Sequence, residues 1–241
     1  MKKIKMLTCI LASIVLFSSL NMTSVSANDA CSENSGNYAK INEKEYQEYL
    51  DSFSQEQLQE KAEKELTVQL MMSQADNIST YAVTKLSLPG TFNMYQQEED
   101  TYCGPACIKS ALMYIKGSSP TQKSINNSIN ESFTAIPNYM NDRQTKSTYL
   151  MLTSPTKTQI TSTIKTDITI EEIPTFLRIS GTSTANWYYA TNGHCVLSNA
   201  LYSDYSSVQI ADPLGDRVSG CPYYYLKAAS TLSNYVTHLI Y

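Results

Sequence analysis

Apolar residues between Asn42 and Met72 recur mostly at intervals of three and four positions. The stretch contains neither Pro nor Gly, and this period is typical of an amphipathic helix. Ser54 followed by Gln57 suggests a capping box just before Leu58. We therefore predict one or two helices here, with a second helix starting near Ser54. The apolar positions are Tyr46, Tyr49, Leu50, Phe53, Leu58, Ala62, Leu66, Val68 and Leu70.

From Thr84 onward the pattern changes to short segments separated by Pro, Gly, Asn and Ser. A helix is predicted from Cys103 to about Ile115, because Gly104 and Pro105 suit a first turn and Gly117 ends the run. A second, short helix is predicted over 121–132. Residues 161–170 alternate Ser or Thr with Ile, and 171–173 look like the start of a further helix.

The last third of the chain favours strands. Residues 195–201 and 208–210 are rich in β-forming side chains, and the turn 203–206 separates them. Helices early and strands later are typical of an α+β fold. We therefore expect an α+β domain.

The composition excludes several classes of protein. Of 241 residues, 42% are hydrophobic and 17% are charged, which is a globular rather than a disordered or fibrous composition. The formal net charge is −4, and no Lys/Arg cluster lies beyond the extreme N-terminus. Nucleic-acid binding needs a basic stripe, so we expect no nucleic-acid partner.

The first 27 residues have the pattern of a secretory signal peptide. Three lysines precede the apolar run 6–20, and the small residues Val25-Ser26-Ala27 follow. The run is shorter than the roughly 20 residues that span a bilayer. We expect cleavage after Ala27 and a soluble, secreted, extracellular protein that has no membrane contact after signal cleavage.

Charge divides the remaining chain. Residues 28–85 carry 11 acidic and 5 basic side chains, whereas residues 86–241 carry 11 and 10. The shift predicts a boundary near 82–88. The chain is accordingly interpreted as a signal peptide (1–27), an acidic helical segment (28–85) and a main domain (86–241).

Cysteine and histidine are scarce enough to narrow the search for a nucleophile. Removing Cys9 with the signal leaves five cysteines, an odd number that predicts at least one free thiol and leaves the disulfide pairing open. The chain has two histidines, so a Cys/His pair must use one of them. These residues are Cys31, Cys103, Cys107, Cys195, Cys221, His194 and His238.

Cys103 is the best candidate nucleophile. It starts the predicted helix, where the backbone dipole and unpaired amides favour the thiolate over the thiol. Cys107 lies one turn later, where that effect has faded, so it is expected to pack in the core or join a disulfide. His238, three residues from the end, is expected to be structural.

Four blocks surround this cysteine. Gln97 precedes it by six residues, Cys103 opens a Cys-Gly-Pro-Ala run, Gly193-His194-Cys195-Val196 follows, and Asp212-Pro213 comes 18 residues after the histidine. This order resembles the papain-like cysteine peptidases. It is most similar to the bacteriocin-processing peptidases, which cut leader peptides after a double glycine, and to their stand-alone secreted relatives. The resemblance covers roughly 86–241.

The resemblance implies a papain-like α+β fold, in which an N-terminal helix that carries Cys103 packs on an antiparallel sheet that carries His194 and Asp212. It also implies a cysteine peptidase with a peptide or protein substrate. Cys103 would be the nucleophile, His194 the acid and base, and Asp212 the residue that orients the imidazole. The backbone N–H of Cys103 and the side-chain amide of Gln97 would form the oxyanion hole. No metal or organic cofactor would be required. Cys195 is not part of this pattern, and the chain carries no transporter segment of the kind often fused to such peptidases, so the substrate stays open.

The same resemblance bears on residues 28–85. Secreted papain-like enzymes commonly carry helical segments that cover the cleft and delay activity. We therefore interpret residues 28–85 as a propeptide or regulatory segment, with an integral part of the fold and a spacer as the alternatives.

Several alternatives remain for single residues. Gln96 could replace Gln97 as the donor, and Asp212 could simply open a turn, with Asp204 and Asp216 as poorer orienters. A zinc site would need ligands at a spacing that fits zinc geometry badly. The aromatic residues could line a substrate groove, although half-buried sheet positions are favoured. The zinc set is Cys103, Cys107, His194 and Cys195, and the aromatic set is Trp187, Tyr188, Tyr189 and 223–225.

Two other functions use the same residues. A transglutaminase-like or phytochelatin-synthase-like acyltransferase would place an amine where a peptidase uses water. A non-catalytic extracellular binding module would keep the fold for adhesion or peptide capture. The oligomeric state is left open by the sequence.

Overall fold

The computed structural model describes residues 39–75 and 82–241. Every described residue belongs to one compact unit. The expected signal peptide, Cys9 and Cys31 lie outside the described residues. Within the described ranges, no helix has the length and apolar character needed to cross a membrane.

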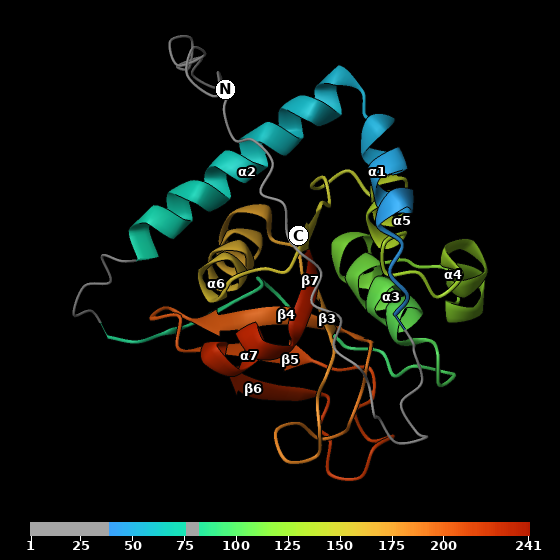
Figure 1. The fold of residues 1–241 in the computed structure, drawn as a ribbon, viewed down its shortest axis with the longest axis vertical. Coiled ribbons are helices and arrows are strands. Elements are labelled where there is room, and N and C mark those ends of the chain that lie inside the picture. The colour runs from blue at the N-terminus through green and yellow to red at the C-terminus, as the bar shows by residue number, and fades with distance from the viewer. Residues whose placement is uncertain (1–38, 76–81) are drawn as a thin grey trace. The chain divides into compact units, whose positions relative to one another are not determined.

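One antiparallel sheet of seven strands forms the centre of this unit. The strand order is β2-β7-β3-β4-β5-β6, and β1 pairs with β4 outside this path. The fold is therefore α+β, as predicted (Figure 1). The strands are β1 (Lys85–Ser87), β2 (Met151–Thr153), β3 (Thr175–Ile179), β4 (His194–Tyr202), β5 (Ser207–Ala211), β6 (Tyr224–Ala228) and β7 (Val236–Ile240).

Seven α-helices accompany the sheet in the described part of the chain, and a π-helical turn, η1 (Asp167–Glu171), extends one of them. Helix α3 packs on β4 and contacts α4 and α5, whereas α6 contacts β4, α2 and α7. The helices are α1 (Glu43–Asp51), α2 (Gln55–Ala75), α3 (Cys103–Lys116), α4 (Gln122–Ile129), α5 (Ile136–Asn141), α6 (Lys157–Thr166) and α7 (Ala229–Tyr235).

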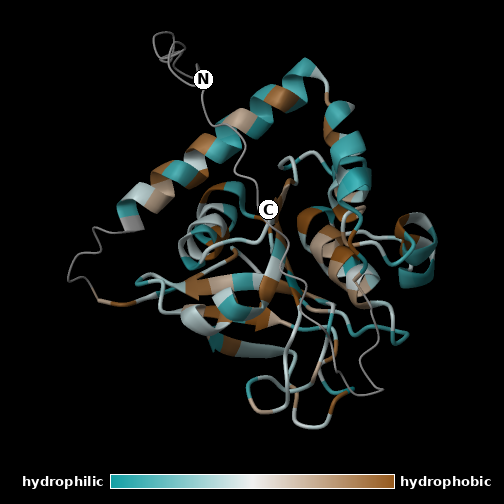
Figure 2. Ribbon diagram, viewed as in Figure 1, coloured by the Kyte–Doolittle hydropathy of each residue, from teal (hydrophilic) through white to brown (hydrophobic). Residues whose placement is uncertain are grey.

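Helices α3 and α6 cover opposite faces of the sheet. In β4, Val196 belongs to a core with α6, whereas its neighbours Cys195 and Leu197 belong to a core with α3. Successive side chains of a strand point to opposite faces, so the two cores lie on the two sides of the sheet. All three residues are fully buried. Figure 2 shows β4 and α3 as largely hydrophobic and α1 as largely hydrophilic.

Most predicted elements are present. Two helices occupy the N-terminal stretch, and the Ser54–Gln57 capping box forms, with distances of 3.2 and 3.0 Å. Helix α3 begins at Cys103 and is followed by Gly117 in the left-handed conformation. Thr121 caps the next helix, which ends before Asn130. The strands predicted around 195–201 and 208–210 are β4 and β5.

The helix predicted to begin at 171–173 is wrong, because a helix ends there. A capping box of Thr156 and Gln159 starts α6 earlier, at Lys157. Three hydroxyls of the Ser/Thr stretch return hydrogen bonds to the preceding turn, as Thr166 does to the Ser162 carbonyl at 3.0 Å. Pro174 then precedes β3.

The acidic N-terminal helices pack against the rest of the unit. Tyr46 of α1 is buried, and its hydroxyl accepts from the Met151 backbone N–H at 2.6 Å. In α2, the buried Lys64 donates to Ser147 Oγ at 3.0 Å and to the Thr148 carbonyl at 3.2 Å. These contacts favour the alternative in which the segment is integral to the fold. Proteolytic removal of residues 28–85 as a propeptide stays a prediction.

Candidate active site

Three segments of the chain bring the predicted residues together. Cys103 is the first residue of α3, and His194 is the first residue of β4, the strand on which α3 packs. Asp212 directly follows β5, which pairs with β4 in antiparallel register. All three side chains are fully buried. The site therefore lies where the start of a helix meets the ends of two neighbouring strands.

His194 and Asp212 form a buried pair. Nε2 of His194 lies 2.9 Å from Oδ1 of Asp212. Burial by itself lowers the pKa of His194, but the charge and hydrogen bond of Asp212, together with the Cys103 thiol, raise that pKa to about 10. Burial raises the pKa of Asp212, but the charge of His194 and the donors around the carboxylate hold it below its usual value. The charged forms of both residues are therefore favoured.

Cys103 completes this pair on the other side of the imidazole. The thiol lies close enough to the ring to raise the pKa of His194. Because Nε2 faces a carboxylate, Nε2 carries a proton, and Nδ1 is left to face the thiol. Nδ1 is buried and has no hydrogen-bond partner in the described ranges. Nδ1 is therefore the nitrogen that could take the thiol proton, and the raised pKa of His194 favours the thiolate–imidazolium pair that would result.

The Asp212 carboxylate has more partners than the sequence predicted. Its Oδ1 also accepts from the Leu214 backbone N–H at 2.9 Å, so Asp212 opens a turn as well as binding His194. Its Oδ2 accepts from the Tyr225 hydroxyl at 2.6 Å and from the Tyr189 hydroxyl. The tyrosines were noticed in the sequence, but nothing in their spacing indicated that they meet one carboxylate.

Gln97 lies in the loop before α3, and its side chain is buried. Its Nε2 donates to the Glu99 and Asp100 carbonyls, both at 3.0 Å, and these two acceptors are enough to use both amide hydrogens. Its Oε1 is buried with no hydrogen-bond partner in the described part of the chain. The alternative donor, Gln96, gives its amide hydrogen to the Gly215 carbonyl at 3.0 Å.

Two further side chains, neither singled out from the sequence, fix this loop. Arg217 donates to the Gln97 carbonyl at 2.9 Å and to Asp100 Oδ1 at 2.7 Å. Gln122 of α4 is buried, donates to the Gln96 carbonyl at 2.6 Å and accepts from the Glu98 N–H at 3.0 Å. The loop that carries Gln97 is thereby tied to the Asp212 turn and to α4.

The other cysteines form no metal site or disulfide in the described residues. Cys107 Sγ donates to the Cys195 carbonyl at 3.3 Å, and burial raises the pKa of Cys107 well above its usual value. Cys107, Cys195 and Cys221 are buried thiols. Within residues 39–75 and 82–241, no group of His, Cys, Asp and Glu is arranged to hold a metal ion. The zinc alternative therefore has no support in the geometry.

His238 lies apart from this site. Its Nε2 is 2.9 Å from Glu43 Oε1 of α1, so it links β7 to the N-terminal helices. The other two carboxylates considered as orienters lie in turns. Asp204 accepts from the Ser206 N–H and hydroxyl, and Asp216 donates its backbone N–H to the Cys221 carbonyl.

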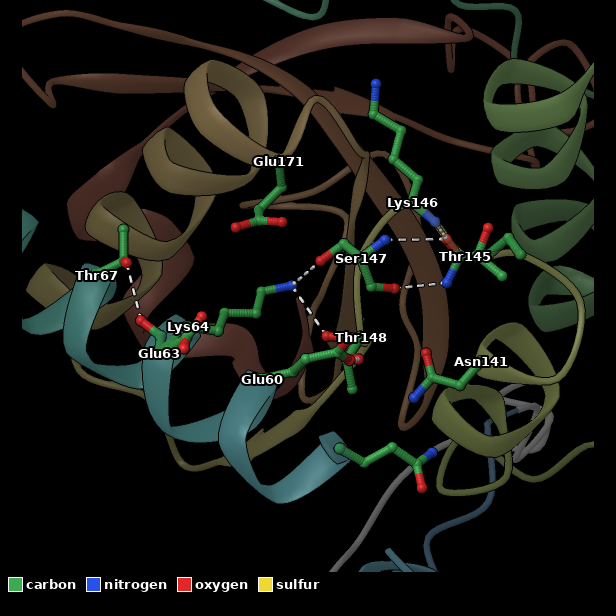
Figure 3. A pocket seen from close by; sticks show the side chains of 12 residues that line it. Glu60, Glu63, Lys64, Thr67, Asn141, Thr145, Lys146, Ser147, Thr148 and Glu171 are labelled. Carbon is green, nitrogen blue, oxygen red and sulfur yellow. Dashed lines mark hydrogen bonds between the residues drawn. The ribbon is translucent and has the colours of Figure 1, made fainter. Parts of the chain in front are cut away.

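A polar pocket of about 400 Å³ lies between α2 and the loop at 144–148. Figure 3 shows Lys64 reaching across it to Ser147 and Thr148, with the Glu171 carboxylate nearby. None of the predicted site residues lines it. This pocket therefore lies where α2 packs against the rest of the domain, and it is separate from the candidate active site.

Comparison with known protein families gives one match. The model of the Peptidase_C39 like family matches residues 90–236, more than half of the chain, and this range includes Gln97, Cys103, His194 and Asp212. No curated protein matches the sequence. The family is papain-like, which agrees with the α+β fold and with the resemblance found in the sequence. The chain belongs to the Peptidase_C39 like family.

Proposed function

We propose that the protein is a cysteine peptidase that hydrolyses peptide bonds through Cys103, His194 and Asp212. Family membership indicates a cysteine peptidase. The observation that supports this particular site is the buried meeting of the three residues, in which the His194 ring bonds the Asp212 carboxylate and the Cys103 thiol raises the pKa of that ring. A nucleophile, a base and an orienting carboxylate in that order are the components of covalent acyl transfer.

In the proposed reaction, Nδ1 of His194 takes the proton of the Cys103 thiol. The thiolate attacks the substrate carbonyl carbon, and the C–N bond breaks as the imidazolium protonates the departing amine. His194 then deprotonates a water molecule, which hydrolyses the thioester and releases the acid. Asp212 keeps the proton on Nε2 throughout, so that Nδ1 remains the nitrogen that exchanges protons.

The tetrahedral intermediate carries a negative oxygen that needs donors. The Cys103 backbone N–H lies at the start of α3, where no earlier helical carbonyl is available to it. Gln97 is the proposed second donor. Its amide hydrogens lie against the Glu99 and Asp100 carbonyls, so one of these bonds must be exchanged for the oxyanion when substrate binds.

A substrate can reach Cys103 only if a neighbouring segment moves, because the Cys103 side chain is fully buried. The N-terminal segment reaches this region at Ala39, which is buried in one core with Cys103. Arg178 Nε donates to the Ala39 carbonyl at 2.6 Å, and Lys40 pairs with the backbone at 131–133. These contacts support a role for the N-terminal segment in controlling access.

A chain that begins at Thr84 tests this role. If the segment is a removable propeptide, the shortened chain should fold and cleave peptides at least as fast as the longer one. Adding residues 28–85 as a separate peptide should then slow cleavage by the shortened chain. The contacts of Tyr46 and Lys64 lead us to expect a large loss of stability instead, measured as the urea unfolding midpoint by circular dichroism. Either outcome decides between a propeptide and an integral part of the fold.

We also propose that the protein is secreted after cleavage at Ala27. The support is the N-terminal pattern of lysines, apolar run and small residues. N-terminal sequencing of protein recovered from culture medium should give Asn28 as the first residue, or a later residue if the helical segment is also removed. Protein that stays with the cells and begins at Met1 would contradict this proposal.

The central experiment incubates the protein with a diverse peptide library and identifies the products by mass spectrometry. Cys103→Ala should abolish cleavage and covalent labelling by an electrophilic peptide, while circular dichroism remains unchanged. Cys107→Ser is the matched control. Its thiol contacts the Cys195 carbonyl rather than His194, so this variant should keep measurable activity.

Other outcomes would redirect the assignment. An inactive Cys107→Ser and an active Cys103→Ala would show that the nucleophile is misassigned. Products that carry an added amine in preference to water would indicate an acyltransferase. A wild-type protein that neither cleaves peptides nor reacts with the electrophile at neutral pH would indicate a binding module.

A further inference from the structure

The side of Asp212 that faces away from His194 is enclosed by two phenols. Tyr189 comes from the loop before β4 and Tyr225 from β6, and both hydroxyls donate to Oδ2. Each tyrosine is only 7% exposed. With His194 and the Leu214 N–H on Oδ1, the carboxylate accepts four hydrogen bonds. Two segments far apart in the chain thus converge on one oxygen.

Toward the carboxylate, these phenols act as donors. Burial, reinforced by the charge of Asp212, raises the pKa of Tyr189 and of Tyr225 well above the usual value, so both stay protonated. Hydrogen bonds to the charged form of a carboxylate favour that form. Removing one donor from a buried carboxylate leaves the charge with one compensating bond fewer, since no solvent replaces the lost bond.

Aromatic packing holds the two hydroxyls in place. The Tyr189 ring meets the His194 ring edge to face, with centroids 5.2 Å apart. The Tyr225 ring lies 4.7 Å from that of Tyr188 and 6.0 Å from that of Trp187. Lys227 Nζ stands 4.4 Å from the Trp187 ring centroid. The same residues therefore orient the carboxylate and exclude solvent from it.

We propose that Tyr189 and Tyr225 are positioning residues, which keep Asp212 ionised and aligned so that Nε2 of His194 retains its proton. This proposal rests on the proposed function of Asp212 as the orienting carboxylate. It assigns to two aromatic residues a role in the acid–base step, although neither touches the nucleophile.

The expected signature is a shift of the acid limb of the pH profile. Loss of one hydroxyl destabilises the carboxylate, so Asp212 becomes protonated at a higher pH and activity fails earlier on acidification. One donor fewer should move the acid limb upward by about 1 pH unit, and loss of both should move it further. The titratable groups that face Asp212 are His194 (β4), Tyr189, Tyr225 (β6), Cys107 (α3) and Cys221.

The test compares kcat/KM from pH 3 to 8 for Tyr189→Phe, Tyr225→Phe and the double variant. Tyr149→Phe is the matched control, because Tyr149 is a fully buried phenol that donates to the Pro174 carbonyl at 3.2 Å, away from Asp212. The Tyr189 and Tyr225 variants should shift the acid limb and the control should not. Equal losses at every pH, with an unchanged profile, would overturn the proposal.

A second measurement separates this proposal from the proposed function. The chain has two histidines, so His238→Ala identifies the His194 imidazole signals in NMR spectra. The acidic inflection that Asp212 imposes on those signals should move upward in Tyr225→Phe. If it moves while the wild type cleaves no peptide, the positioning holds and the peptidase proposal fails. If it stays fixed while Cys103-dependent cleavage persists, the peptidase proposal stands and the positioning fails.

Discussion

Two buried pairs of a cation and a carboxylate in the described residues differ in the direction in which the pKa of the carboxyl group is shifted. His194 and Asp212 are 2.9 Å apart at the candidate site, whereas Lys64 of α2 lies 3.7 Å from Asp167. All four side chains are buried. The pKa of Asp212 is held below its usual value, but burial raises the pKa of Asp167 to about 7.

The difference lies in the number of donors around each carboxylate. Asp212 accepts four hydrogen bonds, including those of two phenols. Asp167 accepts one, from the Thr175 hydroxyl to Oδ2 at 2.6 Å, and its Oδ1 has no hydrogen-bond partner among the described residues. Lys64 directs its own hydrogen bonds to Ser147 and Thr148. Burial penalises a charge unless hydrogen bonds compensate it, so only the first pair is held firmly in its charged form.

The largest expected effects come from breaking the pair at the candidate site. His194→Ala should lower kcat by roughly 10⁶-fold, about as much as Cys103→Ala, because members of such a site act as a unit. Asp212→Asn should leave more activity, with a loss of roughly 10⁴-fold, because the asparagine favours the wrong tautomer and Nδ1 can then accept a proton only part of the time. Single-turnover rates on folded variants measure both. A nearly active His194→Ala would contradict the assignment.

A smaller effect is expected from the oxyanion donor beside this pair. Gln97→Ala should lower kcat by about 10²- to 10³-fold, the usual cost of removing one oxyanion donor, with KM little changed. Gln96→Ala is the matched control, because its amide contacts the Gly215 carbonyl. If Gln96→Ala is slow and Gln97→Ala has wild-type rates, Gln96 is the donor.

The sequence was most informative where local rules decide the structure. The start of α3 at Cys103, the Ser54–Gln57 capping box and the β4–β5 hairpin follow from helix caps, periodicity and turn residues. The proximity of Cys103, His194 and Asp212 was expected from the family resemblance, and the structure brings them together. The roles of these residues stay predictions.

The sequence was least informative where distant segments meet. Tyr189 and Tyr225 converge on Asp212 only because β6 lies beside β5 in the sheet, an order that no local pattern encodes. The Lys64–Asp167 pair likewise depends on α2 packing against α6. The helix start predicted at 171–173 was wrong for a related reason. Acidic residues often begin a helix, but here Glu171 and Glu172 lie at the end of η1, the π-helical turn that extends α6.

The smallest effects should appear at the pair that is held less firmly, and they should depend on pH. The folded-state pKa of Asp167, about 7, lies above the unfolded value of about 3.9, so the folded state retains a proton that the unfolded state releases. The contribution of this group to the free energy of unfolding is therefore greatest below about pH 4 and falls as the pH rises towards 7.

The Asp167→Asn variant has no proton to lose at this position. Its free energy of unfolding in urea, relative to wild type, should therefore rise by a few kcal/mol at most between pH 4 and 7. His194 and Asp212 also titrate between the folded and unfolded states, but both are retained in the variant, so the difference isolates Asp167. Asp51→Asn, an exposed change in α1, is the control and should give a difference that is flat with pH. An equally flat difference for Asp167→Asn would mean that Asp167 is ionised in the folded protein, and the contrast between the two buried pairs would disappear.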